Sequence, residues 1–151
     1  MSSDSRQKIR PIARADYPGL IELFREFALF EKRPEKMVNS IERMEKDSDY
    51  IKGFVIENDQ QELVGYVTCF YTFHTWTGKS MYMDDLYVQE KYRGAGLGKS
   101  LLNHVIDEAR ASECLSLRWL VSNWNNEAME FYKGLGAEIT NNEYQCELKL
   151  T

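Results

Sequence analysis

The sequence is short of the residues that build metal sites and disulfide frameworks. It has only two histidines and three cysteines among 151 residues. Cys69, Cys114 and Cys146 form no Cys-x-x-Cys pair, so neither a zinc site nor a redox motif is indicated. We therefore expect no bound metal, and we expect reduced cysteines that behave as small hydrophobic residues in a reducing compartment.

Long apolar runs and an excess of positive charge are also missing. No stretch approaches the roughly 20 apolar residues that span a bilayer, and the polar N-terminus lacks a signal peptide. A net charge of −5 argues against a nucleic-acid partner and is compatible with a small cationic substrate. These absences predict a cytoplasmic protein with neither a membrane nor a nucleic-acid partner.

What the chain does have is enough apolar material for one core. Hydrophobic residues make up 43% of the sequence and aromatic residues 13%. A length of 151 residues fits a single domain over 1–151. The Ser- and Asp-containing start, residues 1–7, is expected to be a loose tail.

Hydrophobic spacing predicts the order of the elements. The first half reads as a strand at 8–13, a helix capped by Asp16 with Pro18 in its first turn, and a second helix opened by Pro34. Three strands at 53–57, 63–73 and 80–88 follow, joined by short polar turns, which indicates an antiparallel meander.

The second half alternates helices and strands. A helix from 97 to 109, a strand at 115–122, a helix capped by Asn125 or Asn126 and ended by Gly136, and a final strand at 143–150 are expected. Together these elements predict a mixed α/β fold in which helices cover the faces of a sheet.

A glycine-rich segment, Arg93 to Lys99, follows a predicted strand and opens a helix. In that position backbone N–H groups point at an anion, so we interpret the segment as a diphosphate-binding loop. The step from Gly96 to Gly98 is one residue too short for a Rossmann fingerprint. A P-loop requires glycine where Arg93 stands, which leaves a nucleotide triphosphatase as a weak alternative.

The pattern Arg93-x-x-Gly96-x-Gly98 resembles the cofactor signature of the GNAT acetyltransferase superfamily. The segment from Trp124 to Ala137 is similar to that family's second conserved block, and the order of elements matches along nearly the whole chain. The resemblance implies a mostly antiparallel sheet of about six to seven strands flanked by about four helices. It also implies acetyl-CoA as cosubstrate and a homodimer, with exposed aromatic residues and the last strand as candidate contacts.

Within the superfamily, the segments 27–32, 71–79 and 84–88 are similar to the diamine (spermidine/spermine and thialysine) N-acetyltransferases. By this resemblance the cofactor-binding residues are Leu86, Tyr87, Val88, Arg93, Gly94, Ala95, Gly96, Leu97, Gly98, Lys99, Asn125, Asn126, Glu127 and Ala128.

The same resemblance assigns two catalytic roles. Asp84 stands where the diamine enzymes carry an acid, usually Glu, that takes the proton of the amine; Tyr132 stands at the position of the general acid. Asp84 or Asp85 could instead serve only a strand bulge, and Tyr132 could be a core aromatic. Adjacent strand residues face opposite ways, so at most one of Asp84 and Asp85 is expected to enter the site.

The substrate-binding residues are expected to be Phe30, Glu31 and Asp84. Lys32, Arg33 and Lys36 crowd this acidic segment, so a short diamine or a thialysine-like amino acid suits it as well as spermidine does. Two alternatives stay open: an acetyltransferase acting on proteins or peptides, and a non-catalytic acyl-CoA sensor.

Overall fold

The computed structural model describes residues 7–151. The chain divides into two compact units: one ends at Trp119 and the other runs from Leu120 to Thr151. The expected loose tail at 1–7 lies, except for Gln7, outside the described residues. The expectation of a single domain stays a prediction.

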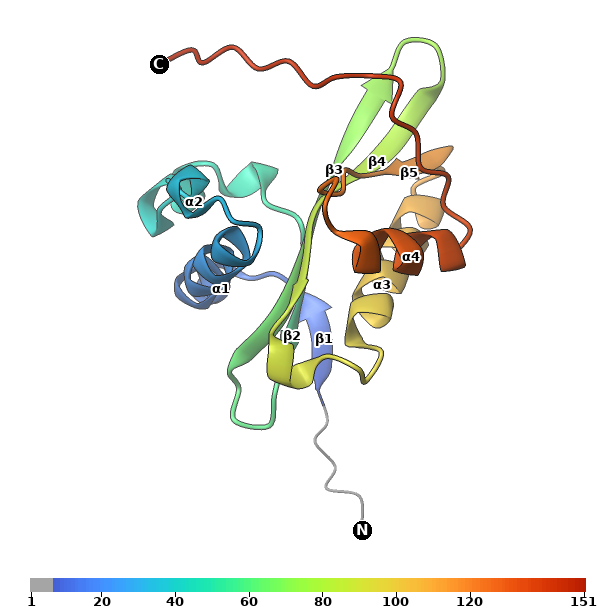
Figure 1. Ribbon diagram of the computed structural model, residues 1–151. Helices are drawn as coiled ribbons and strands as arrows, with labels where there is room; N and C mark the ends of the chain where they lie inside the picture. The colour runs from blue at the N-terminus through green and yellow to red at the C-terminus, as the bar shows by residue number, and fades with distance from the viewer. Residues whose placement is uncertain (1–6) are drawn as a thin grey trace. The chain divides into compact units, whose positions relative to one another are not determined.

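The first unit is built on one five-stranded sheet (Figure 1). Its strands follow one another in chain order, and every neighbouring pair is antiparallel except the last, which is parallel. The strands are β1 (Lys8–Pro11), β2 (Gly53–Glu57), β3 (Leu63–His74), β4 (Gly78–Val88) and β5 (Ser116–Arg118).

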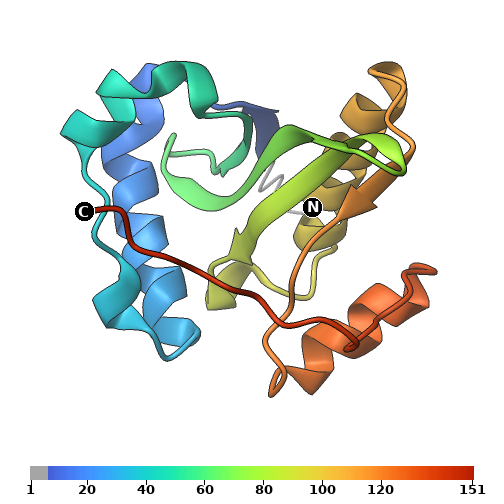
Figure 2. The same cartoon turned by 90° about the horizontal axis from the view of Figure 1, so that it is seen from above.

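Helices cover both faces of this sheet. Helices α1 (Tyr17–Phe30) and α2 (Ile41–Lys46) lie on one side and α3 (Leu97–Ala111) on the other, as Figures 1 and 2 show. Asp16 occupies the position before α1, as predicted, but its carboxylate makes no capping bond to the helix. It accepts hydrogen bonds from Arg10 and from the Ala13 N–H instead.

The mixed α/β class is confirmed, but the strand count was overestimated. The residues that the structure describes form five strands, and the segment 143–150 forms none. The alternating pattern of this segment predicts a strand, but a strand forms only where a neighbour supplies ladder hydrogen bonds. No such hydrogen bonds form at residues 143–150. The strand expected at 115–122 shortens to β5, and Pro34 opens only a single 3₁₀ turn.

The core on the α1 side is unusually rich in tyrosine. Tyr66 of β3 is fully buried, and its ring contacts Phe24 of α1 and Tyr87 of β4. Leu20 and Leu23 of α1 pack into the same cluster. Burying each leucine side chain contributes about 1.5–3 kcal/mol, so this face holds β3, β4 and α1 together.

A β-bulge interrupts the pairing of β3 with β4. Thr68 lies opposite Asp85 and Cys69 lies opposite Met83, so Asp84 has no partner residue and is the extra residue of the bulge. A bulge bends its strand and redirects the side chains that follow. This irregularity lies directly at the two acidic residues of β4.

The second unit contains α4 (Asn126–Gly134), and its ends match the sequence prediction. The Asn125 side chain accepts a hydrogen bond from the Ala128 N–H, which caps the first turn. The chain leaves the helix at Gly136, whose φ of 92° suits glycine. The Tyr132 carbonyl accepts from the N–H groups of Leu135 and Ala137 at this end.

Candidate active site

Two adjacent carboxylates form the acidic centre of the first unit. Asp85 accepts a hydrogen bond from the Tyr66 hydroxyl at 2.7 Å, and its own N–H donates to Thr68 Oγ1 at 3.2 Å. Asp84, the bulge residue, is exposed. Among the described residues neither carboxylate forms an ion pair.

Burial and like charges disfavour ionisation of these acids. Burial, followed by the charges of Asp84 and Glu31, raises the pKa of Asp85 to about 6, although the hydrogen bond from Tyr66 lowers it. Partial burial also raises the pKa of Asp84. An acid whose pKa lies near neutrality can hold a cation and exchange a proton with it.

Both carboxylates lie close enough to two tyrosines to affect the pKa of each phenol. The pKa of Tyr66 is raised by burial and by the charges of Asp85 and Asp84, and that of Tyr82 by burial and the same two charges. Simple alternation would have sent one acid to each face. The bulge adds a residue between Met83 and Asp85, so simple alternation does not apply here, and the expectation that at most one of the two acids enters the site stays a prediction.

The end of α1 brings the predicted substrate residues to this centre. Glu31 follows directly after α1, and its charge raises the pKa of Asp85. The preceding residue, Phe30, lies with its ring 5.0 Å from the guanidinium carbon of Arg93. Glu31 thus lies near the carboxylate pair, and Phe30 lies beside Arg93.

The glycine loop has the backbone of an anion site. Gly94 and Gly96 have φ values of 86° and 78°, and Gly96 is the residue that precedes α3. Within the described chain, the N–H groups from Gly94 to Lys99 have no hydrogen-bond acceptor. Unsatisfied N–H groups at a helix start are donors that a phosphate group can use.

Gly98 also fits the interpretation of this loop as an anion site. It lies in the first turn of α3, where alanine would favour the helix by about 1 kcal/mol. A Cβ atom added there would meet no atom within 4 Å. Packing within the chain thus gives no reason for glycine at this position, which fits the close approach of a ligand.

Arg93 links the loop to the end of β4. Its Nε donates to the Val88 carbonyl at 2.7 Å, and its guanidinium carbon lies 5.6 Å from the centre of the Tyr87 ring. The sequence resemblance places Arg93 among the cofactor-binding residues. Arg93 therefore connects the start of the glycine-rich segment to Val88, Tyr87 and Phe30.

The outer edge of β4 is open where the cofactor arm was expected. β5 pairs with β4 only along Ser80 to Tyr82. In the described part of the chain, no strand pairs with the stretch from Leu86 to Val88 on that edge. An open strand edge can pair with an extended ligand as it would with another strand.

In the second unit, Asn125, Asn126, Glu127 and Ala128 form the start of α4. Tyr132 lies one turn further on, and its ring packs edge-on against Phe131 at 5.4 Å. The combined action of Tyr132 and Asp84 on one substrate stays a prediction.

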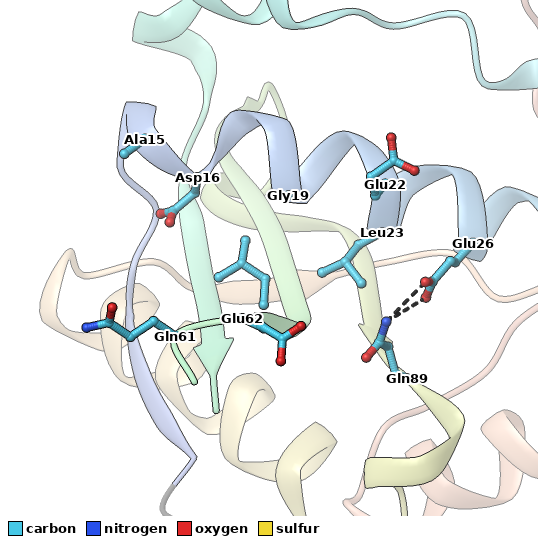
Figure 3. Close-up of a pocket in the computed structure, with 10 residues that line it drawn as sticks. Ala15, Asp16, Gly19, Glu22, Leu23, Glu26, Gln61, Glu62 and Gln89 are labelled. Atoms are coloured by element: carbon cyan, nitrogen blue, oxygen red, sulfur yellow. Dashed lines mark hydrogen bonds between the residues drawn. The ribbon is translucent and has the colours of Figure 1, made fainter. Parts of the chain in front are cut away.

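A separate hollow of about 390 Å³ lies at the start of α1 (Figure 3). It includes none of the predicted site residues, and its acids are already engaged: Glu26 accepts from Gln89 Nε2 at 3.0 and 3.1 Å and from the Tyr87 hydroxyl at 3.1 Å. Its lining residues are Ala15, Asp16, Gly19, Glu22, Leu23, Glu26, Gln61, Glu62, Leu63 and Gln89.

Residues 7–151 contain no group of three His, Cys, Asp or Glu residues that could hold a metal ion. None of their helices has the length and apolar character that crossing a membrane requires.

Comparison with known proteins assigns the family. The model of the acetyltransferase (GNAT) family matches residues 9–137. The chain belongs to this family. It is therefore an acyltransferase.

Relatives support the narrower resemblance as well. The thialysine N-epsilon-acetyltransferase of Bos taurus is 32% identical over 141 residues, which cover 86% of this chain and 83% of that protein. The spermidine/spermine N(1)-acetyltransferase-like protein 1 of Homo sapiens is 29% identical over 86% of this chain and 20% of its own length. The predicted similarity to the diamine group is thus confirmed.

A solved structure supports the fold. An aminoglycoside acetyltransferase from an uncultured soil metagenomic sample, in complex with trehalose, matches with a TM-score of 0.79 at 21% identity, covering 95% of this chain and 97% of that one. At this identity the match concerns the fold alone.

Sequence reasoning missed Asp85 and Tyr66 as a pair. Tyr66 reads as one more apolar residue of a strand, and Asp85 reads as the neighbour that faces away from Asp84. No spacing rule reveals the pair, because it depends on a bulge between two strands. The one available signal was the doubled acid, Asp84-Asp85, in the middle of a strand.

Proposed function

We propose that the chain transfers the acetyl group of acetyl-CoA to a primary amine of a small molecule: a diamine, a polyamine or a thialysine-like amino acid. The observation that carries the proposal is the carboxylate pair Asp84 and Asp85 on the bulged strand, with Glu31 nearby. Three neighbouring acids create a negative site that suits an ammonium group.

The acids have to solve a protonation problem. A primary amine has a pKa of about 10.4, so only about one molecule in 10³ is neutral near pH 7. Asp84, aided by Asp85, binds the ammonium group and takes its proton directly or through water. The neutral nitrogen then attacks the acetyl carbon, so that a C–N bond forms and the C–S bond breaks.

The remaining residues hold the cosubstrate and the leaving group. The N–H groups from Gly94 to Lys99 bind the pyrophosphate, and the edge of β4 from Leu86 to Val88 pairs with the pantetheine arm. Asn125 to Ala128 line that arm near the sulfur. Tyr132 donates its phenolic proton to the departing thiolate. Acetyl-CoA itself supplies the reactive thioester, and we infer no role for a metal.

Substrate length is the open choice within this proposal. Lys32, Arg33 and Lys36 follow Glu31 closely in sequence, and cations beside the acidic centre disfavour a long polycation. The similarity to a thialysine N-epsilon-acetyltransferase points the same way. We therefore expect thialysine-like amino acids and short diamines to be better substrates than spermine.

The test is an amine panel with acetyl-CoA and detection of released thiol. The expected result is turnover of at least one diamine or thialysine-like amino acid, with kcat/KM exceeding that for lysine-containing peptides. Higher activity on peptides would replace the proposal with a protein acetyltransferase. Tight acetyl-CoA binding without transfer to any amine would replace it with a sensor.

Replacing Tyr132 tests the proton donor. Tyr132→Phe removes the hydroxyl and keeps the ring, so kcat should fall by about 10²-fold while the Kd for acetyl-CoA stays unchanged. Steady-state kinetics and calorimetric titration measure the two quantities. Tyr144→Phe, in the same unit, is the matched control. An unchanged kcat in Tyr132→Phe removes this residue as the acid.

We further infer a homodimer in the cytoplasm, as the family resemblance implies. The hairpin of β3 and β4 supports it, because Phe73 and Trp76 are 77% and 97% exposed there. Sedimentation of the full chain tests the inference, and a monomer at micromolar concentration would contradict it.

A further inference from the structure

The hydroxyl of Tyr66 is the one part of this residue that packing does not require. Its ring fills the core between Phe24 and Tyr87 and has no exposed surface. A phenylalanine ring would fill the same space. Burying a hydroxyl costs about 1–3 kcal/mol unless it forms a hydrogen bond, and here its partner is the Asp85 carboxylate.

We propose that Tyr66 is a positioning residue of the amine site: its buried phenol fixes the Asp85 carboxylate beside Asp84 and keeps it ionised at neutral pH. The inference rests on the proposed function, because it assumes that Asp85 attracts the ammonium group of a substrate. It adds a residue from β3 to a site that the sequence placed on β4 and at the end of α1.

The surroundings of Asp85 show why such a donor is needed. Asp84 on the same strand and Glu31 beyond α1 are both negative and both oppose its ionisation. Tyr82 lies close enough for its phenol to feel both aspartates, but it makes no hydrogen bond to either among the described residues.

Among the described residues, no other nearby side chain donates to this carboxylate. The Tyr87 hydroxyl donates to Glu26, and the Thr68 hydroxyl oxygen accepts from the Asp85 N–H. In the described chain, Tyr66 is therefore the donor that stabilises the Asp85 carboxylate. Losing this hydrogen bond removes an interaction that favours the charged form, so the pKa of Asp85 rises.

The variant Tyr66→Phe tests the inference through a pH profile. For the best amine of the panel, we expect the acidic limb of kcat/KM to move up by about one pH unit. Activity then falls about tenfold at the acidic end and less than about threefold above pH 8, where Asp85 is ionised in both proteins. Tyr17→Phe, which removes a phenol from the same core, should leave the limb in place.

A second measurement does not depend on turnover. Carbon-13 NMR of the Asp85 carboxyl group should show a titration midpoint at about 6 in the unmodified protein and a higher one in Tyr66→Phe. An unmoved midpoint overturns the role of Tyr66 in ionisation.

The combined outcomes separate the two proposals. An equal loss of activity at every pH, or a moved midpoint with an unmoved limb, overturns the positioning role while the proposed function stands. Absence of transfer to every amine by the unmodified protein overturns the proposed function, and the amine-site role of Tyr66 with it. A midpoint and a limb that rise together support the inference.

Discussion

Two aspartates of the first unit, Asp16 and Asp85, are both shielded from water but have different charged and hydrogen-bonding neighbours. Asp16 has 6% of its surface exposed and receives two hydrogen bonds of 2.8 Å from the Arg10 guanidinium. Asp85 is half-buried, has Asp84 and Glu31 for charged neighbours, and receives one hydrogen bond from the neutral Tyr66.

Their pKa values shift in opposite directions as a result. Hydrogen bonds from Arg10 lower the pKa of Asp16 in spite of its burial. Burial raises that of Asp85 to about 6. A paired acid holds the structure together at neutral pH, whereas an unpaired acid costs stability and stays available for a cation from outside. The contrast separates a structural carboxylate from a functional one.

Removing Arg10 should give the largest effect on stability. Arg10 also donates to Glu57 at 2.7 and 3.1 Å, so Arg10→Gln leaves two acids unpaired. We expect the free energy of unfolding at pH 7 to fall by about 3 kcal/mol. Urea denaturation measures it, and kcat/KM per folded molecule should be unchanged.

The pH dependence of this loss has a definite sign. The folded-state pKa of Asp16 lies below its unfolded value of about 3.9, so the stabilisation is present above that pH and disappears as pH falls through the folded value. Arg25→Gln, which breaks an exposed ion pair with Glu22, should cost less than about 1 kcal/mol. Equal losses in both variants would contradict the structural role of Arg10.

The sequence predicted the fold well where local rules decide the structure. Asn125 and Gly136 mark the two ends of α4, as helix-capping preferences predict. The meander of β2, β3 and β4 follows from the alternating pattern and the polar turns. The prediction of a strand at 143–150 was wrong because a strand needs a hydrogen-bonded neighbour as well as an alternating pattern. The local sequence pattern does not show whether such a neighbour exists.

The candidate site likewise has one part that local sequence rules predict and one part that they do not. The glycine loop follows from its spacing, since Gly94, Gly96 and Gly98 each leave room that the chain itself does not fill. The pairing of Tyr66 with Asp85 depends on a bulge and on contacts between residues 19 positions apart. Such pairs need the three-dimensional register, which a single sequence does not state.

Neutralising Asp85 should change the free energy of unfolding by less than the loss of Arg10 does, and in the opposite direction. Because its folded pKa is raised to about 6, the folded state favours the protonated form, and stability falls as pH rises from about 4 through about 6. Asp85→Asn removes this cost. We expect it to stabilise the protein by about 2 kcal/mol at pH 8, with little effect near pH 4, and to reduce acetyl transfer strongly.

Thermal or urea unfolding at the two pH values measures this gain. Asp59→Asn, in the exposed turn between β2 and β3, is the matched control and should change stability by less than about 0.5 kcal/mol. A loss of stability at pH 8 in Asp85→Asn would mean that Asp85 is a structural acid like Asp16.

Neutralising Asp84 should give the smallest free-energy change of these variants. It tests most directly why the pKa of Asp85 differs from that of Asp16. Its charge raises the pKa of Asp85, so Asp84→Asn should lower the Asp85 titration midpoint by about half a pH unit, equivalent to about 0.7 kcal/mol. This shift runs against the one expected for Tyr66→Phe and is read by the same carboxyl NMR signal. Asp84→Glu keeps the charge and should hold the midpoint within about 0.3 pH units of its original value. A midpoint that stays in place in Asp84→Asn would show that burial alone, and not the neighbouring acid, separates Asp85 from Asp16.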